Sequence, residues 1–448
     1  MFKDSPVKNL LANKMPRRTF LKWSGALGVP VIAGGVGTKL LIDKQKEDNV
    51  ASASEWDKVV STCSINNCGG RCVIKAYVKD GVVVRVATDT TVRGDPSIPP
   101  LRACVRGRNY RNLLYHPDRL KYPMKRVGKR GEGKFERISW EEAIETIASE
   151  IKRIGETYGP ESRYVNYASG QSWGLHGGRN SARKVLALTG GYLNYPNEYS
   201  SGAGNVATPY TYGTNNSGSS FDSLLHSKYI ILWGQNPSEM IFSTPYRDYL
   251  MQAKKNGAKI ILIDPRYTDT AIAFADEWIP IKPTTDNAMM DAMGYVIITE
   301  KLHDQEFLDK YCIGFDGDHM PEGVAKEESV KSYLLGEKDG VAKTPEWAEK
   351  ICGVPAEKIR EIARNYATIK PAALIQGWAA QRQAYGEQFM RGGAQLACIT
   401  GNVGKLGGWA AGTGYWSRAD IVYPFKVENP VKASIPCFLW TKAVEQGT

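Results

Sequence analysis

Four of the eight cysteines lie within one N-terminal stretch of 42 residues: Cys63, Cys68, Cys72 and Cys104. Their spacing is C-x4-C-x3-C-x31-C, so three thiols share a short loop and the fourth returns from a distance. The uneven spacing suits a 4Fe–4S cluster, in which each thiolate binds a different iron, better than zinc, whose structural sites often use paired C-x2-C units. A zinc site and two disulfides remain alternatives, the disulfides because an oxidising compartment favours them.

The other four cysteines are scattered along the chain and show no metal-binding spacing. We expect them to be small apolar residues of the core. They are Cys312, Cys352, Cys398 and Cys437.

Two apolar, strand-like runs, Tyr229–Trp233 and Lys259–Ile263, end in residues that suit nucleotide binding. At the carboxyl end of a strand, glycine lets the backbone approach a phosphate, an amide can bind base edges, and a carboxylate can hold ribose hydroxyls or a guanine edge. Ordinary turns use the same residue types, which is the alternative interpretation. There is no Walker A sequence and no G-x-G-x-x-G after a strand, which disfavours ordinary NTPases and dinucleotide-binding enzymes. The residues that follow the two runs are Gly234, Gln235, Asn236 and Asp264.

The elements that position these residues follow from hydrophobic periodicity. Near the cysteines, short strands are expected at Val59–Thr62, Val73–Val78 and Val82–Ala87, with Asp80-Gly81 as a hairpin turn. A capping box at 139–142 then begins a helix whose isoleucines recur at helical spacing up to Gly155. These isoleucines are Ile144, Ile147, Ile151 and Ile154.

Strand-like and helical patterns alternate through the rest of the chain. Such alternation predicts an α/β fold, with a doubly wound, mostly parallel, Rossmann-like sheet after the small β-rich domain. The segment 199–220 is rich in Gly, Ser, Asn and Thr and shows no periodicity, so we expect a functional loop or a disordered segment there. Strands are expected at Tyr164–Tyr167, Tyr229–Trp233, Lys259–Ile263 and Ala373–Gln376, and helices near 245–255, 287–300, 345–351, 355–367 and 387–400.

The composition is that of a globular enzyme of two or three domains: 448 residues, 42% hydrophobic and 23% charged. It excludes a disordered or collagen-like chain, and eight cysteines are too sparse for a disulfide scaffold. The net charge of +11 is local, since residues 1–53 carry +5 and a block at 102–137 carries +9. No nucleic-acid-binding motif accompanies this block, so we expect no nucleic-acid partner.

The first 53 residues are predicted to be an export signal. Arg17-Arg18 opens a twin-arginine core, followed by a weakly apolar, glycine-rich stretch and by Ala51-Ser52-Ala53, whose small residues suit a signal peptidase. We therefore expect twin-arginine export to the periplasm or the outer face of the cytoplasmic membrane. An uncleaved anchor and an incidental basic N-terminus are the alternatives.

Several motifs together, in this order, resemble the molybdopterin oxidoreductases, and most closely the catalytic subunits of anaerobic dimethyl sulfoxide reductases. The resemblance covers the chain from about residue 56 onward. It departs from the family in the x4 gap after Cys63 and in Thr284, where a glycine is usual. The motifs are the four N-terminal cysteines, Cys104–Arg108, His116–Met124, Glu198–Ser201, Ile263–Asp269 and Thr400–Gly404.

The resemblance implies a role for each candidate residue. The four N-terminal cysteines would bind a 4Fe–4S cluster, and Arg106 would lie between the cluster and the pterin. Ser200 would ligate molybdenum as a hard oxygen donor, with Ser201 as the competing residue. The guanine nucleotide parts of a molybdenum bis(molybdopterin guanine dinucleotide) cofactor would be held by Gly234, Gln235, Asn236, Asp264 and Asp286.

The implied activity is oxygen-atom transfer from a sulfoxide or N-oxide in anaerobic respiration. Electrons would come from an iron–sulfur electron-transfer subunit, fed with quinol through a membrane anchor subunit. The export signal would bind the twin-arginine machinery and a chaperone. Selenate, thiosulfate and polysulfide are alternative substrates of related enzymes.

The expected domains are the signal at 1–53, a 4Fe–4S domain at 54–118 and a molybdopterin oxidoreductase domain at 119–448. Members of the family run to nearly twice this length. We therefore expect the last domain to be incomplete at its C-terminal end. An inactive truncated product that retains only cluster or chaperone binding is the non-enzymatic alternative.

Overall fold

The computed structural model describes most of the chain, from Trp56 to Gly447. The predicted export signal, Cys68 and the end of the expected strand at Tyr164–Tyr167 lie outside the described residues. The described ranges are 56–64, 72–91, 102–165, 178–196, 198–215, 217–240, 246–412 and 427–447.

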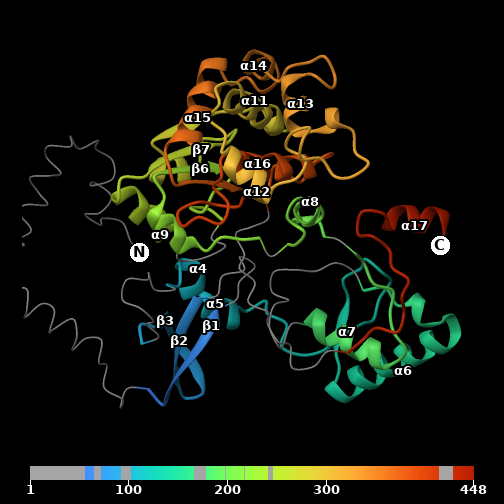
Figure 1. Ribbon diagram of the computed structural model, residues 1–448. Coiled ribbons are helices and arrows are strands. Elements are labelled where there is room, and N and C mark those ends of the chain that lie inside the picture. Colours follow the sequence, from blue (N-terminus) through green and yellow to red (C-terminus); the bar gives the residue numbers. More distant parts are fainter. Residues whose placement is uncertain are drawn as a thin grey trace, which may run out of the picture. The chain divides into compact units, whose positions relative to one another are not determined.

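The N-terminal part is a three-stranded sheet in the order β1-β2-β3 (Figure 1). Its strands are β1 (Lys58–Ser64), β2 (Cys72–Lys79) and β3 (Val82–Thr88), as the sequence predicts. Asp80 and Gly81 join the last two with φ of 51° and 72°, the geometry of a tight hairpin turn. By contacts, residues 56–59 and Tyr77–Val83 form one compact unit and the other described residues form a second.

A four-stranded parallel sheet forms the centre of the second unit, in the order β8-β7-β6-β9. Its strands are β6 (Tyr229–Trp233), β7 (Lys259–Ile263), β8 (Glu277–Ile279) and β9 (Ala372–Gln376). Both faces of β6 are buried, because Ile231 packs into one hydrophobic cluster and Ile230 into another on the opposite face. The expected α/β fold with a parallel sheet is confirmed.

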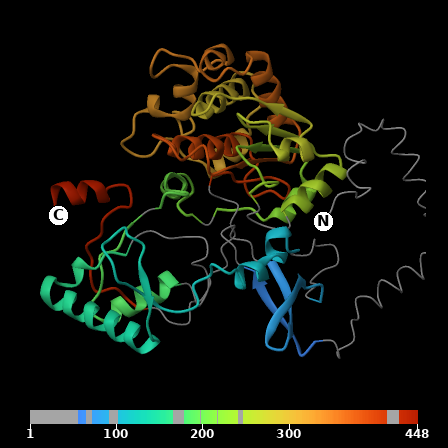
Figure 2. The ribbon, with the colours of Figure 1, turned by 180° about the vertical axis from the view of Figure 1, so that it is seen from behind.

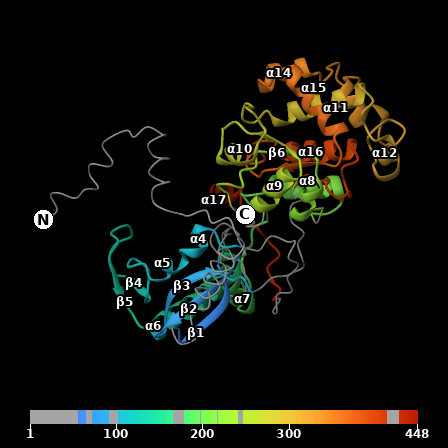
Figure 3. The same cartoon turned by 90° about the vertical axis from the view of Figure 1, so that its left-hand side faces the viewer.

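Helices cover both faces of this sheet. In Figures 1 and 3, α9 lies on one side of β6, while α11, α14 and α15 lie on the other. Figure 2 shows the same layers from behind. The helices here are α9 (Tyr246–Lys255), α10 (Asp269–Phe274), α11 (Asp286–Thr299), α12 (Gln305–Tyr311), α13 (Val330–Leu335), α14 (Pro345–Cys352), α15 (Ala356–Thr368) and α16 (Glu387–Ile399).

The segment before residue 200 contains a short hairpin and two long helices. Helix α6 begins as the capping box predicts, because the Ser139 hydroxyl accepts the Glu142 N–H at 3.0 Å. It extends past Gly155 and ends at Tyr158. The remaining elements are α4 (Val105–Arg108), α5 (Tyr110–Leu114), β4 (Met124–Arg126), β5 (Phe135–Arg137), α6 (Trp140–Tyr158), α7 (Gly178–Leu188) and α17 (Trp440–Gln446), with 3-10 turns at Pro160–Ser162, Phe221–His226 and Lys326–Glu328.

The expected loop at 199–220 is wrong over half of its length, because helix α8 occupies Gly202–Tyr212. Its small residues are buried, and Pro209 removes the hydrogen bond that the Asn205 carbonyl would otherwise accept within the helix. The Asn215 side chain donates to that carbonyl at 3.1 Å instead. Tertiary contacts therefore stabilise a helix whose residues favour turns.

Within the described part of the chain, every helix is too short or too polar to cross a membrane.

Candidate functional site

The residues predicted to bind a nucleotide follow the carboxyl ends of β6, β7 and β8. Gly234, directly after β6, has φ of 62°, and no heavy atom lies within 4 Å of the position that a Cβ would take there. A side chain would be strained in this conformation, so glycine leaves the backbone open to a ligand.

Gln235 and Asn236 hold this edge of the sheet together. Gln235 is buried, and its amide nitrogen donates to the Gln376 carbonyl at the end of β9 at 2.8 Å. The side-chain oxygen of Asn236 accepts the Thr270 hydroxyl at 2.7 Å. Both amides therefore position the loops between strands.

Two buried carboxylates lie at the same edge. Asp264 accepts the N–H of Arg266 at 2.8 Å, and Asp286, at the start of α11, accepts the Trp233 indole N–H at 2.8 Å. Burial raises the pKa of both carboxyls, and the charge of Asp264 raises that of Asp286 further. Paired buried acceptors of this kind suit a ligand rich in N–H and O–H donors, such as a guanine edge or ribose hydroxyls. The residues present therefore fit a nucleotide.

Ser200 lies in the turn that leads into α8, and two side chains from the loop after β9 fix its backbone. Its carbonyl accepts the Gln381 amide N–H at 2.7 Å and the Arg382 Nε–H at 2.8 Å. The Gln381 side-chain oxygen in turn accepts the N–H of Gly204 at 3.2 Å. Gln381 is buried and links the turn to the first turn of the helix. Sequence reasoning missed both side chains, since a Gln-Arg pair in a polar loop gives no local signal.

Ser201 differs from Ser200 in its surroundings. It is buried, and its hydroxyl donates to the Glu198 carboxylate, which also accepts the Asn205 amide at 3.0 Å. Ser200 is half-buried. The Ser201 hydroxyl is thus committed to Glu198.

Of the described N-terminal cysteines, Cys63 and Cys104 have free thiols. Cys72 packs with Ile74 and with Ala103, the neighbour of Cys104, so the third and fourth cysteines lie in the same small cluster of the fold. Cys104 precedes α4; burial opposes ionisation of its thiol, but the N–H groups of Gly107 and Arg106 and the Arg106 guanidinium lower its pKa. A donor set of thiols with such a cysteine fits an iron–sulfur cluster better than a pair of disulfides.

Arg106 also donates to the carbonyl of Glu239, in the segment after β6, at 3.4 Å. Glu239 lies only a few residues after Asn236 in the sequence. Arg106 thus links the cluster-binding segment to the loop after β6.

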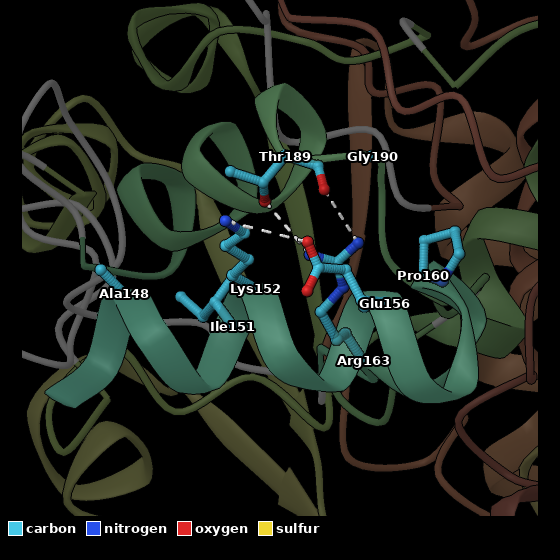
Figure 4. Close-up of a pocket in the computed structure, with 9 residues that line it drawn as sticks. Ala148, Ile151, Lys152, Glu156, Pro160, Arg163, Thr189 and Gly190 are labelled. Atoms are coloured by element: carbon cyan, nitrogen blue, oxygen red, sulfur yellow. Dashed lines mark hydrogen bonds and ion pairs between the residues drawn. The ribbon is translucent and has the colours of Figure 1, made fainter.

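A hollow of about 430 Å³ on α6 contains none of the predicted site residues (Figure 4). Arg163 crosses its floor and donates to the Thr189 hydroxyl at 3.2 Å and to the Thr189 carbonyl at 3.0 Å. The side chain is thus committed to holding the end of α7.

Two family models match this chain. Residues 119–438 match the molybdopterin oxidoreductase family, and residues 56–116 match the molybdopterin oxidoreductase Fe4S4 domain. Dimethyl sulfoxide reductase DmsA from Escherichia coli (strain K12) is 44% identical over 98% of this chain and 55% of its own length. A dimethyl sulfoxide/trimethylamine N-oxide reductase from Rhodobacter capsulatus is 32% identical over 89% of this chain and 47% of its own length.

A solved structure, acetylene hydratase from Pelobacter acetylenicus, matches with a TM-score of 0.60 and 28% identity over 78% of this chain and 44% of that chain. The chain thus spans about half the length of the relatives it matches. The matched families imply a 4Fe–4S cluster and a molybdenum-bound pterin. The resemblance found in the sequence is confirmed, and the chain belongs to the molybdopterin oxidoreductase family.

Proposed function

We propose that this chain belongs to a molybdenum-dependent reductase that removes an oxygen atom from a sulfoxide or an N-oxide. The observation that carries the proposal is the 44% identity to a dimethyl sulfoxide reductase along nearly the whole of this chain. When bound, the molybdenum centre supplies the oxygen-accepting, two-electron chemistry, and the protein supplies its ligand, orientation and electrostatics.

We propose the bis(molybdopterin guanine dinucleotide) form of the cofactor. The buried carboxylates of Asp264 and Asp286 would accept hydrogen bonds from the donor edge of a guanine or from ribose hydroxyls. The open backbone at Gly234 would allow close approach of a phosphate. Gln235 and Asn236 would keep the two loops in register through their contacts with Gln376 and Thr270.

Ser200 would provide the protein ligand to molybdenum. Gln381 and Arg382 hold its backbone carbonyl, so two partners from another loop fix the backbone of the turn at Ser200. A hard alkoxide oxygen at this place suits a high-valent metal. The Arg382 guanidinium also adds positive charge beside the turn, which would favour the ionised form of the serine.

Electrons would enter through a cluster held by Cys63, Cys68, Cys72 and Cys104. Arg106 bridges this segment and the loop after β6, and its charge would favour the reduced cluster. An iron–sulfur subunit and a quinol-oxidising membrane subunit would deliver the electrons. The basic segment at 102–137 would form part of the contact with that iron–sulfur subunit.

Location and domain limits remain proposals. The Arg17-Arg18 motif supports export by the twin-arginine machinery, with a signal-binding chaperone, to the periplasmic side of the cytoplasmic membrane. The proposed domains are the signal at 1–53, the 4Fe–4S domain at 54–118 and the molybdopterin oxidoreductase domain from 119 onward.

The test is metal analysis and an acceptor screen on protein purified anaerobically after expression from its own genomic locus. We expect about four irons and about one molybdenum per chain, release of guanosine monophosphate on acid hydrolysis, and oxidation of reduced methyl viologen by dimethyl sulfoxide or trimethylamine N-oxide. Turnover with selenate or thiosulfate alone would instead identify one of the related reductases. Zinc without iron would refute the proposal.

The variants Ser200→Ala and Ser201→Ala form a matched pair. Ser200→Ala should change the molybdenum(V) EPR spectrum and abolish sulfoxide reduction, while iron content stays the same. Ser201→Ala should keep the parent molybdenum spectrum. The reverse pattern would assign the ligand to Ser201.

A further inference from the structure

Two cysteines that are far apart in the sequence line the same cavity, and their thiols are in hydrogen-bond contact. Cys312 directly follows α12, and Cys398 is the second-last residue of α16, 86 positions later. The Cys312 N–H donates to the Leu308 carbonyl at 3.0 Å, which fixes its backbone at the end of α12. The spacing of the two cysteines gives no sign of this pairing. Both are half-buried rather than buried as expected, and Cys312 packs against the main hydrophobic cluster.

The two thiols are unequal. A hydrogen bond from Cys398 lowers the pKa of the Cys312 thiol, although burial opposes this, and the same contact, together with burial, raises the pKa of Cys398. The single proton of the Cys398 thiol is shared between Cys312 and the Tyr212 hydroxyl oxygen, 3.9 Å from the Cys398 sulfur, because Tyr212 gives its own proton to the Ala410 carbonyl. Cys312 is therefore the more nucleophilic sulfur, and Cys398 is the sulfur that stays protonated.

Both thiols line a cavity of about 900 Å³. Arg391 and Lys405 also line it, and no carboxylate is found among its described lining residues. A small anionic thiol or disulfide, such as glutathione, carries charge complementary to Arg391 and to Lys405, and the Lys405 ammonium is also paired with the Asp304 carboxylate at 3.3 Å. The cavity thus gives the pair what buried structural cysteines lack, which is access for a reagent.

We propose that Cys312 and Cys398 form a redox-active dithiol site that a small anionic disulfide of the glutathione type converts into an intramolecular disulfide. The Cys312 thiolate attacks one sulfur of the disulfide reagent, whose S–S bond breaks and releases one thiol. Cys398 then loses its proton and attacks the Cys312 sulfur, which expels the second thiol. The protein gives up two electrons and two protons, and these appear on the two released thiols.

The bond would join the end of α12 to the end of α16 across one wall of the cavity. It would also remove the Cys398 hydrogen that is directed at Tyr212, the last residue of α8. Helix α8 begins two residues after Ser200, the predicted molybdenum ligand. Oxidation of the pair would therefore change a contact at the C-terminal end of that helix. The proposal itself concerns only the pair and holds whatever the chain reduces.

The test uses the full chain, purified anaerobically and incubated in buffers of reduced and oxidised glutathione, then acid-quenched, alkylated and mapped by mass spectrometry. We expect a peptide pair linked through Cys312 and Cys398, lost again on reduction. In the reduced protein we expect alkylation of Cys312 to be at least about tenfold faster than that of Cys352, which is fully buried and whose pKa burial raises.

Single-serine variants separate the two roles. Cys398→Ser should trap glutathione as a stable mixed disulfide on Cys312, whereas Cys312→Ser should leave Cys398 unmodified. Cys352→Ser should still form the linked peptide and serves as the control. A mixed disulfide on Cys312 in the unaltered chain without any linked peptide would overturn the proposal, as would modification of Cys398 before Cys312.

Discussion

Helices α6 and α15 are equally amphipathic in sequence, yet they differ in what they bury. Helix α15 places Ile359, Ile362 and Tyr366 in the core, where they pack with residues of α11 and α14. Helix α6 has no buried residue, and the side chain of Ile147 is 60% exposed. The comparison teaches that periodicity specifies a helix, whereas burial requires a partner surface that periodicity does not specify.

The largest expected effect comes from removing the same side chain in the two helices. Ile362→Ala should lower the free energy of unfolding by about 2–5 kcal/mol, because it leaves a cavity between α15 and the sheet. Ile147→Ala should change the free energy of unfolding by less than about 0.5 kcal/mol. Ile147 stays mostly exposed in the described structure, and alanine favours the helical conformation.

Urea unfolding followed by tryptophan fluorescence checks this pair. The transition that includes the parallel sheet should shift in Ile362→Ala and stay in place in Ile147→Ala. Equal losses in the two variants would mean that α6 is packed as tightly as α15, and the contrast between the helices would fail.

The second largest effect is a change of stability with pH, which arises because a buried carboxylate is costly to ionise. Burial raises the pKa of Asp291 on α11 to about 7, although Tyr333, Lys343 and Asn287 lower it in part. Below about pH 4 the carboxyl is protonated in both the folded and the unfolded chain. Above that pH the unfolded chain loses this proton first, while the folded chain keeps it until about pH 7. The free energy of unfolding therefore falls as the pH rises through about 7, where the folded chain has to hold a buried charge.

Asp291→Asn removes this charge. We expect the variant to become more stable than the parent as the pH rises from 4 to 8, by up to about 4 kcal/mol. Its new amide can donate to the buried Asn287 side-chain oxygen, which has no partner in the described structure. Unfolding curves at pH 4, 6 and 8 check this expectation. A difference that shrinks with rising pH would show that Asp291 is ionised without cost.

The same contrast explains how much of the molecule the sequence could predict. The strands β6, β7 and β9 were predicted almost to the residue, because short runs of β-branched residues between turn signals have one stable solution when both faces are buried. Helix α8 was missed because its glycines and threonines favour turns, and the contacts that stabilise it, such as that of Gln381, come from residues more than 170 positions away.

The residues of the candidate site fall into two groups: those that a local pattern or a family motif reveals, and those that only the tertiary fold brings together. Asp264 could be found because it directly follows a strand, and Ser200 and Asp286 could be found by resemblance to a family. Gln381, Arg382 and the meeting of Cys312 with Cys398 depend on how distant segments fold together, and no local pattern encodes them.

The smallest expected effect comes from removing the N-terminal caps of α6 and α14. It separates the stabilisation that a helix gains locally from the stabilisation that it gains from tertiary packing. Ser139 caps α6 by accepting the Glu142 N–H, and Thr344 caps α14 by accepting the Trp347 N–H at 3.2 Å. Each change to alanine should cost about 1 kcal/mol. In α6, where no described residue is buried, the loss should appear locally, as amide hydrogen exchange about fivefold faster in the first turn. In α14, which buries Ala348 and Cys352, the amides should keep their protection, because the packed core and not the cap holds the turn. If amide exchange became faster by the same factor in both first turns, the tertiary contacts of α14 would not stabilise its first turn. The two helices would then differ only in how exposed their residues are.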